Sequence, residues 1–265
     1  MPIISTYCKK GGVGKTTLLG YLAHYCSTKN KQVLIISADD QNSIYKLFGH
    51  GEFVTDSTDN FFENYLTDTA AKEDIVFEAR ENMYIIKTLN TDRLSYNMTV
   101  KRQEERRLIN AINEFKQYFD YIFIDFPPSS SRLSEVLLDI SDKILLVIGL
   151  DTLGLDGYLN TIQYFVDTDI DLGKIKYILP TGYHPVKLAP NKALKELKKQ
   201  AASYTPNAII TDPISDKSIV KNIQADGISV FDNVELPKKF HQNNLVEFRK
   251  ELSKVFDSLD LDWFW

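Results

Sequence analysis

The chain has 265 residues and carries 31 Lys and Arg against 36 Asp and Glu, which gives a formal net charge of -5 at pH 7. Hydrophobic residues make up 43% of the chain and charged residues 25%, a composition that excludes a chain disordered throughout. The sequence has no membrane-spanning run and no basic, apolar leader, and its two cysteines lack metal-ligand spacing, so we expect a cytoplasmic protein.

Short apolar runs alternate with longer amphipathic segments along the chain. The runs predict strands at 2–8, 33–36, 83–87, 121–125, 144–148, 175–179 and 208–210. The segments between and after them predict helices at 15–27, 101–118, 133–140, 157–166, 190–203, 216–225 and 243–259. We therefore expect an α/β fold, with a mostly parallel, twisted sheet of about seven to eight strands and helices on both faces. The sequence contains no repeat and no linker, so residues 1–265 are expected to form a single domain.

A glycine-rich loop follows the first predicted strand and leads directly into a helix. It reads Lys9-Lys10-Gly11-Gly12-Val13-Gly14-Lys15-Thr16-Thr17. Its glycines let backbone N–H groups approach phosphate oxygens, and the helix N-terminus adds partial positive charge. In such a loop Lys15 reaches the β- and γ-phosphates, and the Thr16 hydroxyl binds Mg²⁺. The alternative, a glycine turn that only caps a helix, does not explain the Gly-Lys-Thr ending.

The general phosphate-loop pattern has a glycine at the position that Lys10 occupies here. The resulting Lys-Gly-Gly-Val-Gly-Lys-Thr-Thr resembles the deviant Walker A motif of the ParA/MinD superfamily, whose members are P-loop NTPases. The resemblance implies ATP and Mg²⁺ as cofactors and an ATP-dependent homodimer. It also implies that Lys10 crosses the dimer interface to a nucleotide phosphate in the partner subunit. The implied nucleotide-binding residues are Gly11, Gly12, Val13, Gly14, Lys15, Thr16 and Thr17.

The second predicted strand ends in Ser37-Ala38-Asp39-Asp40-Gln41, which resembles the family's Asp-x-Asp-Pro-Gln segment. The resemblance implies that Asp39 positions or activates the attacking water. The sequence departs from the family pattern at Ser37 and Asp40, which leaves the shape of this loop open. An exposed acidic turn is the alternative, more for Asp40 than for Asp39.

The segment 118–128, whose apolar strand leads into Asp125-Phe126-Pro127-Pro128, resembles the Walker B segment. Burying an unpaired carboxylate costs free energy, so packing does not explain one at the end of a buried strand. The resemblance implies that Asp125 holds Mg²⁺. Later in the chain, Thr181 and Pro213 fall where the family contacts the adenine base. A structural turn is an equal alternative for Pro213.

Lysines are concentrated in residues 174–199, where seven lysines and one acid give +6 and leave the rest of the chain at −11. Because Lys192, Lys195 and Lys199 recur at helical spacing, they share one helix face. Most charge runs are solvated helix faces, but members of the family bind DNA nonspecifically through basic residues. The candidate DNA-binding residues are Lys187, Lys192, Lys195, Lys199, Lys217 and Lys221, with Lys238 and Lys239 as an extension.

Residues 56–81 carry eight acids against Lys72 and Arg80, a charge balance that repels DNA and suits a basic partner peptide. The chain ends in Trp263-Phe264-Trp265, preceded by acids. Residues 245–265 have three basic and five acidic groups, the wrong sign for a helix that binds anionic membranes, so no membrane binding is expected. We expect the aromatic tail either to pack against its own domain or to contact a partner.

These features favour a small ParA-type partition ATPase without an N-terminal helix-turn-helix domain, associated with the nucleoid. The resemblance implies that its ATP-bound sandwich dimer binds DNA nonspecifically. A ParB-like, centromere-binding adaptor then stimulates hydrolysis and release. The main alternative is a MinD-like or other positioning ATPase that acts on a membrane or a large assembly. A nitrogenase-reductase-like iron–sulfur protein is a weaker alternative, because Cys8 and Cys26 are poorly placed to bind a cluster. A binding module that has lost hydrolysis is also weaker, because Lys15, Thr16, Asp39 and Asp125 are all present.

Overall fold

The computed structural model describes residues 1–54, 61–233 and 242–262. The acids Asp56 and Asp59, the lysines Lys238 and Lys239 and the aromatic tail 263–265 lie outside the described residues. Among the described helices, none combines the length and the hydropathy needed to cross a bilayer.

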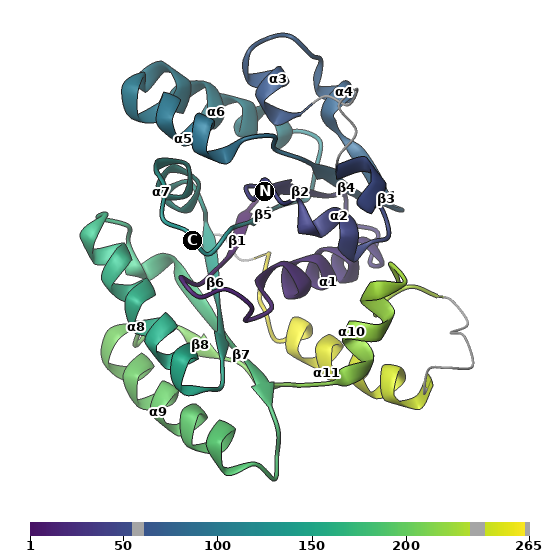
Figure 1. The fold of residues 1–265 in the computed structure, drawn as a ribbon, viewed down its shortest axis with the longest axis vertical. Coiled ribbons are helices and arrows are strands. Elements are labelled where there is room, and N and C mark those ends of the chain that lie inside the picture. Colours follow the sequence, from purple (N-terminus) through teal and green to yellow (C-terminus); the bar gives the residue numbers. More distant parts are fainter. Residues whose placement is uncertain (55–60, 234–241, 263–265) are drawn as a thin grey trace.

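One sheet of nine strands organises the described residues (Figure 1). The strands are β1 (Ile3–Tyr7), β2 (Val33–Ser37), β3 (Phe77–Arg80), β4 (Met83–Ile86), β5 (Tyr121–Asp125), β6 (Lys143–Gly149), β7 (Ile175–Tyr183), β8 (Ile209–Ile210) and β9 (Ile214–Ser215). Their order is β3-β4-β2-β5-β1-β6-β7-β8. The ninth strand, β9, pairs with the carboxyl end of β7, after the part of β7 that pairs with β8. Every pair is parallel except β3 with β4, so the predicted mostly parallel sheet is confirmed.

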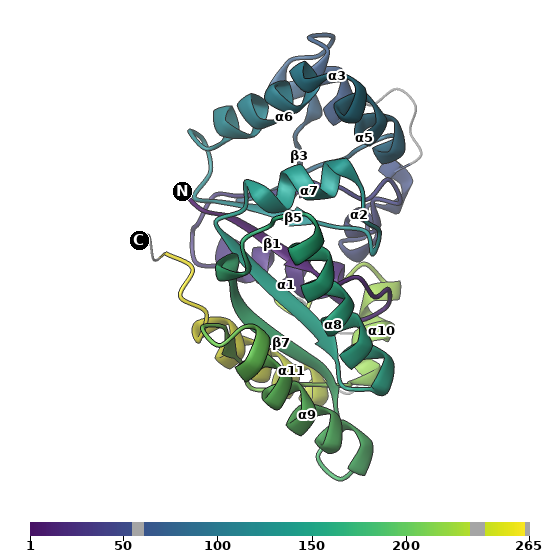
Figure 2. The ribbon, with the colours of Figure 1, turned by 90° about the vertical axis from the view of Figure 1, so that its left-hand side faces the viewer.

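Helices cover both faces of the sheet. They are α1 (Lys15–Ser27), α2 (Ser43–Leu47), α3 (Phe62–Leu66), α4 (Lys72–Ile75), α5 (Thr91–Val100), α6 (Arg102–Phe115), α7 (Arg132–Asp139), α8 (Thr152–Asp167), α9 (Leu188–Tyr204), α10 (Ser218–Ala225) and α11 (Gln242–Asp257). In Figures 1 and 2, α7, α8 and α9 lie on one side of β6 and β7, and α1, α10 and α11 lie on the other. Every residue of β1, β2, β5 and β6 is buried, as expected for strands covered on both faces.

Some elements have no counterpart among the predicted ones. The short helices α2 to α4, the edge strand β3 and the helix α5 fill residues 43–100, where only a strand at 83–87 was predicted. Helix α8 begins at Thr152, five residues before the predicted start at 157. Two glycines weaken helix propensity there, but the Asp151 side chain accepts a hydrogen bond from the Gly154 N–H and caps the helix.

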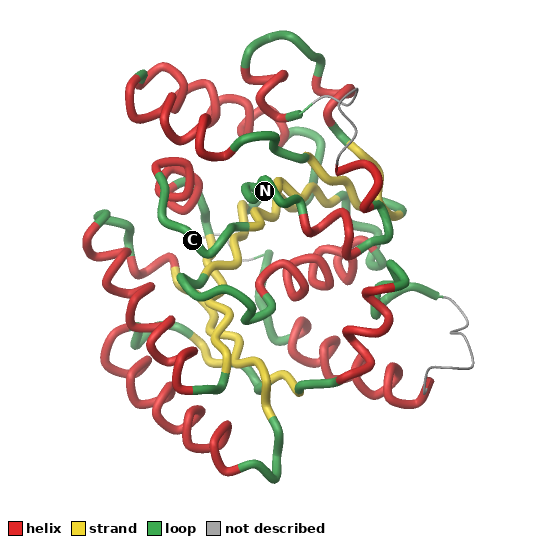
Figure 3. Tube along the Cα trace, viewed as in Figure 1, coloured by secondary structure: helices red, strands yellow, loops and turns green. Residues whose placement is uncertain are grey.

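The strand order reverses at the centre of the sheet. The chain passes from β1 through α1 to β2 on one side, and from β5 through α7 to β6 on the other. The loop between β1 and α1, green in Figure 3, lies at the carboxyl ends of these strands. Parallel sheets bind ligands at such a switch point, so the fold places the glycine-rich loop where a ligand site is expected.

Candidate active site

The glycine-rich loop turns sharply before α1. Gly12 and Gly14 have φ angles of 73° and 96°, and Gly14 is the N-cap residue of the helix. A Cβ at either position would meet nothing within 4 Å, so the left-handed backbone, rather than lack of space, calls for glycine here. A left-handed turn that leads into a helix N-terminus forms a concave site for anions.

Lys15 begins α1 and is buried beneath the loop. Its Nζ donates to the backbone carbonyl of Lys10 at 3.0 Å. Burial lowers the pKa of Lys15, and the nearby carboxylates of Asp125 and Asp39 act in the opposite direction. The loop therefore already holds this ammonium group at its base, facing the same two acids that the sequence assigns to the site.

Asp125 ends β5 with no exposed surface. Its Oδ1 accepts a hydrogen bond from the Thr16 hydroxyl at 3.0 Å, and its buried Oδ2 has no hydrogen-bond partner among the described residues. Burial raises the pKa of Asp125 to about 7, while the Thr16 hydrogen bond opposes the rise. Mg²⁺ prefers oxygen ligands and usually keeps several waters. A hydroxyl beside an unpaired, buried carboxylate oxygen fits that cation, which would be held by Thr16 and Asp125.

Asp39 lies on the loop after β2, beside β5, because Ser37 pairs with Asp125 across the two strands. Its Oδ1 accepts a hydrogen bond from the backbone N–H of Gln41 at 3.0 Å. Asn42 is buried in a left-handed conformation, and its side chain donates to the carbonyls of Asp40 and Thr88. Asn42 therefore fixes the loop whose shape the sequence left open, and Asp39 stays at the carboxyl edge beside Asp125.

Lys10 forms an ion pair with Asp151 of its own chain. The Nζ lies 2.8 Å and 3.1 Å from the two carboxylate oxygens, and this contact lowers the pKa of Asp151. The Lys10 side chain is 23% exposed and that of Asp151 is 62% exposed. An exposed pair of this kind contributes at most about 1 kcal/mol, so Lys10 can leave it at little cost.

Two glycines bring α8 against this loop. A Cβ on Gly154 would lie 1.9 Å from the Gly149 carbonyl oxygen, and one on Gly157 would lie 2.9 Å from the Lys10 Cβ. No larger side chain fits at Gly154 without a backbone shift. The close approach places Asp151, which caps α8, within reach of Lys10.

A cavity of about 610 Å³ opens beside the glycine-rich loop. Thr181 lines it, and its hydroxyl donates to the Val13 carbonyl at 3.0 Å. Pro213 is not among the lining residues, whereas Ile214 and Ser215 of β9 are. From α10, Gln224 lines the cavity and donates to the Thr17 hydroxyl at 3.2 Å. The described residues thus enclose space for a ligand between α10 and the loop.

The candidate DNA-binding lysines fall into two groups. Lys192, Lys195 and Lys199 are exposed along α9, and Lys187 is exposed directly before that helix. Lys217 and Lys221, at the start of α10, line the cavity beside the glycine-rich loop. The structure therefore brings the last two lysines to the ligand cavity and the other four to a separate helix.

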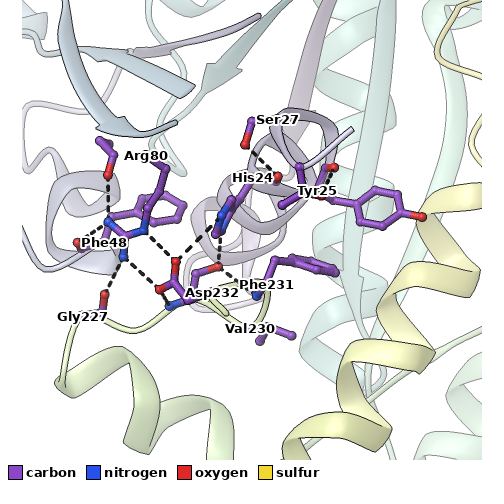
Figure 4. A network of polar contacts seen from close by, with 12 residues as sticks. His24, Tyr25, Ser27, Phe48, Arg80, Gly227, Val230, Phe231 and Asp232 are labelled. Atoms are coloured by element: carbon purple, nitrogen blue, oxygen red, sulfur yellow. Dashed lines mark hydrogen bonds and ion pairs between the residues drawn. The ribbon is translucent and has the colours of Figure 1, made fainter. Parts of the chain in front are cut away.

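A part-buried polar network joins α1, β3 and the segment that follows α10 (Figure 4). Arg80 of β3 forms a bidentate pair with Asp232 at 2.8 Å and 3.0 Å, and also donates to the carbonyls of Phe48 and Gly227. His24 of α1 lies 3.8 Å from Asp232. The network ties the segments that follow α2 and α10 to the helix that begins at the glycine-rich loop.

Sequence reasoning missed Asp151, Gln224 and Asn42. Asp151 carried a usable signal, because it follows a buried strand closely, as Asp39 and Asp125 do. Gln224 and Asn42 had none, since both act through contacts with distant segments.

Comparisons with known proteins agree with this geometry. A family model described as an AAA domain matches residues 1–173. The sporulation initiation inhibitor protein Soj of Bacillus subtilis is 29% identical over 175 residues, covering 63% of this chain and 68% of Soj. The structure of a Cyanothece McdA variant in complex with ATP has a TM-score of 0.78 at 19% identity, covering 100% of this chain and 98% of that one. A plasmid partition protein from Borrelia burgdorferi, bound to AMPPNP, has a TM-score of 0.70 at 21% identity, covering 94% and 98% of the two chains.

Proposed function

This chain belongs to the ParA/MinD family of ATPases, and from that premise we propose that it is a partition ATPase. Residues 1–265 act as one P-loop ATPase domain that binds ATP with Mg²⁺. The ATP-bound form is a homodimer that binds DNA nonspecifically and is released on hydrolysis.

The observation that carries the proposal is the meeting of Lys15, Asp39 and Asp125 at the carboxyl edge of one sheet. The loop N–H groups and Lys15 hold phosphate oxygens, and Thr16 with Asp125 holds the metal. A Mg²⁺ ion held there would neutralise charge that develops on the transferred phosphoryl group. Asp39 orients the attacking water and accepts its proton.

The homodimer is supported by Lys10 and by apolar side chains around the site. Among the described residues of its own subunit, Lys10 pairs with the exposed carboxylate of Asp151, a weak contact that it can exchange for a phosphate of the second subunit. Large apolar side chains are exposed in the segments that follow β4, β6 and β7, at the same edge as the cavity. They are Leu89, Leu153, Val186 and Leu188, with exposed fractions from 59% to 84%. Apolar side chains gathered around a site are typical of a protein interface.

DNA binding is supported by the exposed lysines of α9. Residues 188–204 form a helix of about 25 Å, so Lys192, Lys195 and Lys199 follow one another along a line that can contact successive phosphates. Lys187 extends this line at the start of α9, and Lys217 and Lys221, which line the cavity, form a second group of proposed DNA contacts.

A ParB-like adaptor that stimulates hydrolysis completes the proposed cycle. The similar proteins named above differ in role, since they include a plasmid partition protein and an inhibitor of sporulation initiation, so more than one cargo is compatible with this fold. The second candidate is therefore a positioning ATPase for another large assembly or a membrane. ATP-dependent binding to anionic liposomes, in place of DNA, would favour that candidate.

Lys10→Ala tests the proposal. We expect this variant to bind ATP with Mg²⁺ as the wild type does but to lose ATP-dependent dimerisation and, with it, DNA binding. Nucleotide binding is measured by fluorescence of an ATP analogue, dimerisation by light scattering after size exclusion, and DNA binding by mobility shift. Lys9→Ala is the matched control. A Lys10→Ala protein that still dimerises with ATP would exclude the assigned role of Lys10.

A further inference from the structure

An apolar groove lies at the β3 end of the sheet, away from the cavity beside the glycine-rich loop. It has a volume of about 440 Å³, and its lining residues come from the β3–β4 hairpin, from α4 and from the end of α6 with the loop that follows it. Aromatic rings from Tyr84, Phe115, Tyr118 and Phe119 line it together with Val76. Tyr118 is 53% exposed, so part of its surface is accessible to a partner.

The charge around this groove is acidic. Glu73 and Glu78 line it, and Glu78 lies opposite Tyr84 in the β3–β4 register, where its charge helps burial to raise the Tyr84 pKa. The one lysine among its lining residues, Lys72, is already engaged. Its Nζ lies 3.8 Å from the centroid of the Tyr118 ring and 3.7 Å from Glu73. Among the described residues Glu78 has no ion-pair partner and Glu73 pairs only with Lys72, so an incoming ligand meets apolar rings bordered by two carboxylates and one ammonium group.

We propose that this groove docks a basic segment of a partner protein, one that carries an aromatic or aliphatic side chain between lysines or arginines. The apolar side chain enters between Tyr84, Phe119 and Tyr118, and the cations pair with Glu73 and Glu78. Exposed aromatic rings provide most of the binding free energy in such interfaces, and complementary charge gives selectivity and a fast association rate. Nucleic acids and anionic lipids are repelled by the same carboxylates.

The proposal stands apart from the nucleotide cycle, because no lining residue of the groove lines the cavity beside the glycine-rich loop. It can therefore be tested on the full chain without nucleotide, and its failure leaves the ATPase proposal intact. Failure of DNA binding or of dimerisation would equally leave the groove untouched.

Three fluorescein-labelled synthetic peptides provide the probes. The first alternates lysines and arginines with leucine and tryptophan, the second replaces its apolar residues with serine, and the third replaces its cations with glutamate. We expect the first to bind by fluorescence anisotropy, the second to bind at least about tenfold more weakly, and the third not to bind. Affinity for the first should fall as salt is raised.

Two variants locate the binding. Tyr118→Ser and Glu73→Gln/Glu78→Gln should each weaken the first peptide at least about tenfold. Tyr204→Ser, at a tyrosine of similar exposure on α9, and Glu247→Gln on α11 are the matched controls. Unchanged binding by the groove variants, equal loss in the controls, or preference for the acidic peptide would each overturn the proposal.

Discussion

The ammonium group of Lys10 lies 2.8 Å from the carboxylate of Asp151, although 141 residues separate the two in sequence. Asp151 also caps α8, and the close packing of Gly154 on Gly149 fixes that helix against the loop. Lys10, which we propose contacts the nucleotide of the partner subunit, is thus held in its own subunit by an exposed and weak ion pair.

Asp151→Asn should release Lys10 while keeping the helix cap, since asparagine caps helices as well as aspartate does. We expect ATP-dependent dimerisation to tighten by up to about thirtyfold, because one such pair in each of the two subunits no longer has to be broken. Sedimentation with a slowly hydrolysed ATP analogue measures the change. Asp156→Asn, an exposed acid on the same helix, is the control. Weaker dimerisation of Asp151→Asn would mean that Asp151 helps Lys10 to reach its final position.

Asp39→Ala should leave ATP binding and dimerisation in place and lower the rate of ATP hydrolysis by about a hundredfold or more, because the group that accepts the water proton is lost. Phosphate release measured under saturating ATP reports the rate. The neighbouring Asp40→Ala is the matched control and should hydrolyse ATP at close to the wild-type rate. Equal rates for both variants would remove Asp39 from the proposed chemistry.

Charge reversal of Lys192, Lys195 and Lys199 together should abolish DNA binding without affecting ATP-dependent dimerisation. Each lysine that contacts a phosphate contributes about 0.9 to the dependence of log affinity on log salt. Neutral glutamine replacements should therefore reduce that slope by about three. Reversal of Lys101, Arg102 and Arg106, exposed around the start of α6, is the control. Retained DNA binding by the α9 variant would place the DNA surface elsewhere.

The network of Arg80, Asp232 and His24 should lower the free energy of unfolding in mild acid. Burial lowers the pKa of His24 to about 4 from its ordinary value of 6.5, with Asp232 opposing the shift. Between these values the unfolded chain binds more protons than the folded chain, so stability decreases as pH falls from about 6.5 to 4. The loss from this group should reach about 3 kcal/mol.

Asp232 extends that loss to lower pH. Burial alone would raise the pKa of Asp232, but the hydrogen bonds from Arg80 and Ser229 bring it below its ordinary value. Its contribution is therefore lost only as pH falls through that lowered pKa. Urea unfolding of the wild type and of His24→Gln at a series of pH values tests both. The variant should lose the slope above pH 4, and an unchanged slope would assign it to other groups.

Local motifs explain how much the sequence could predict. The turn before α1 depends on Gly12 and Gly14, whose left-handed angles are set by neighbours in the chain. A strand that ends in a single carboxylate, as at Asp125, is equally a local pattern. The strands and the parallel sheet followed from apolar periodicity for the same reason.

The glycine-rich loop, the acids at the strand ends and the α/β fold could be predicted from the sequence, because short segments encode each of them. The Lys10–Asp151 pair, the cavity between α10 and the loop, and the groove beside β3 could be found only in the folded chain. These features join segments that are far apart in the chain. Their formation depends on the strand order and on close helix packing, which no local pattern specifies.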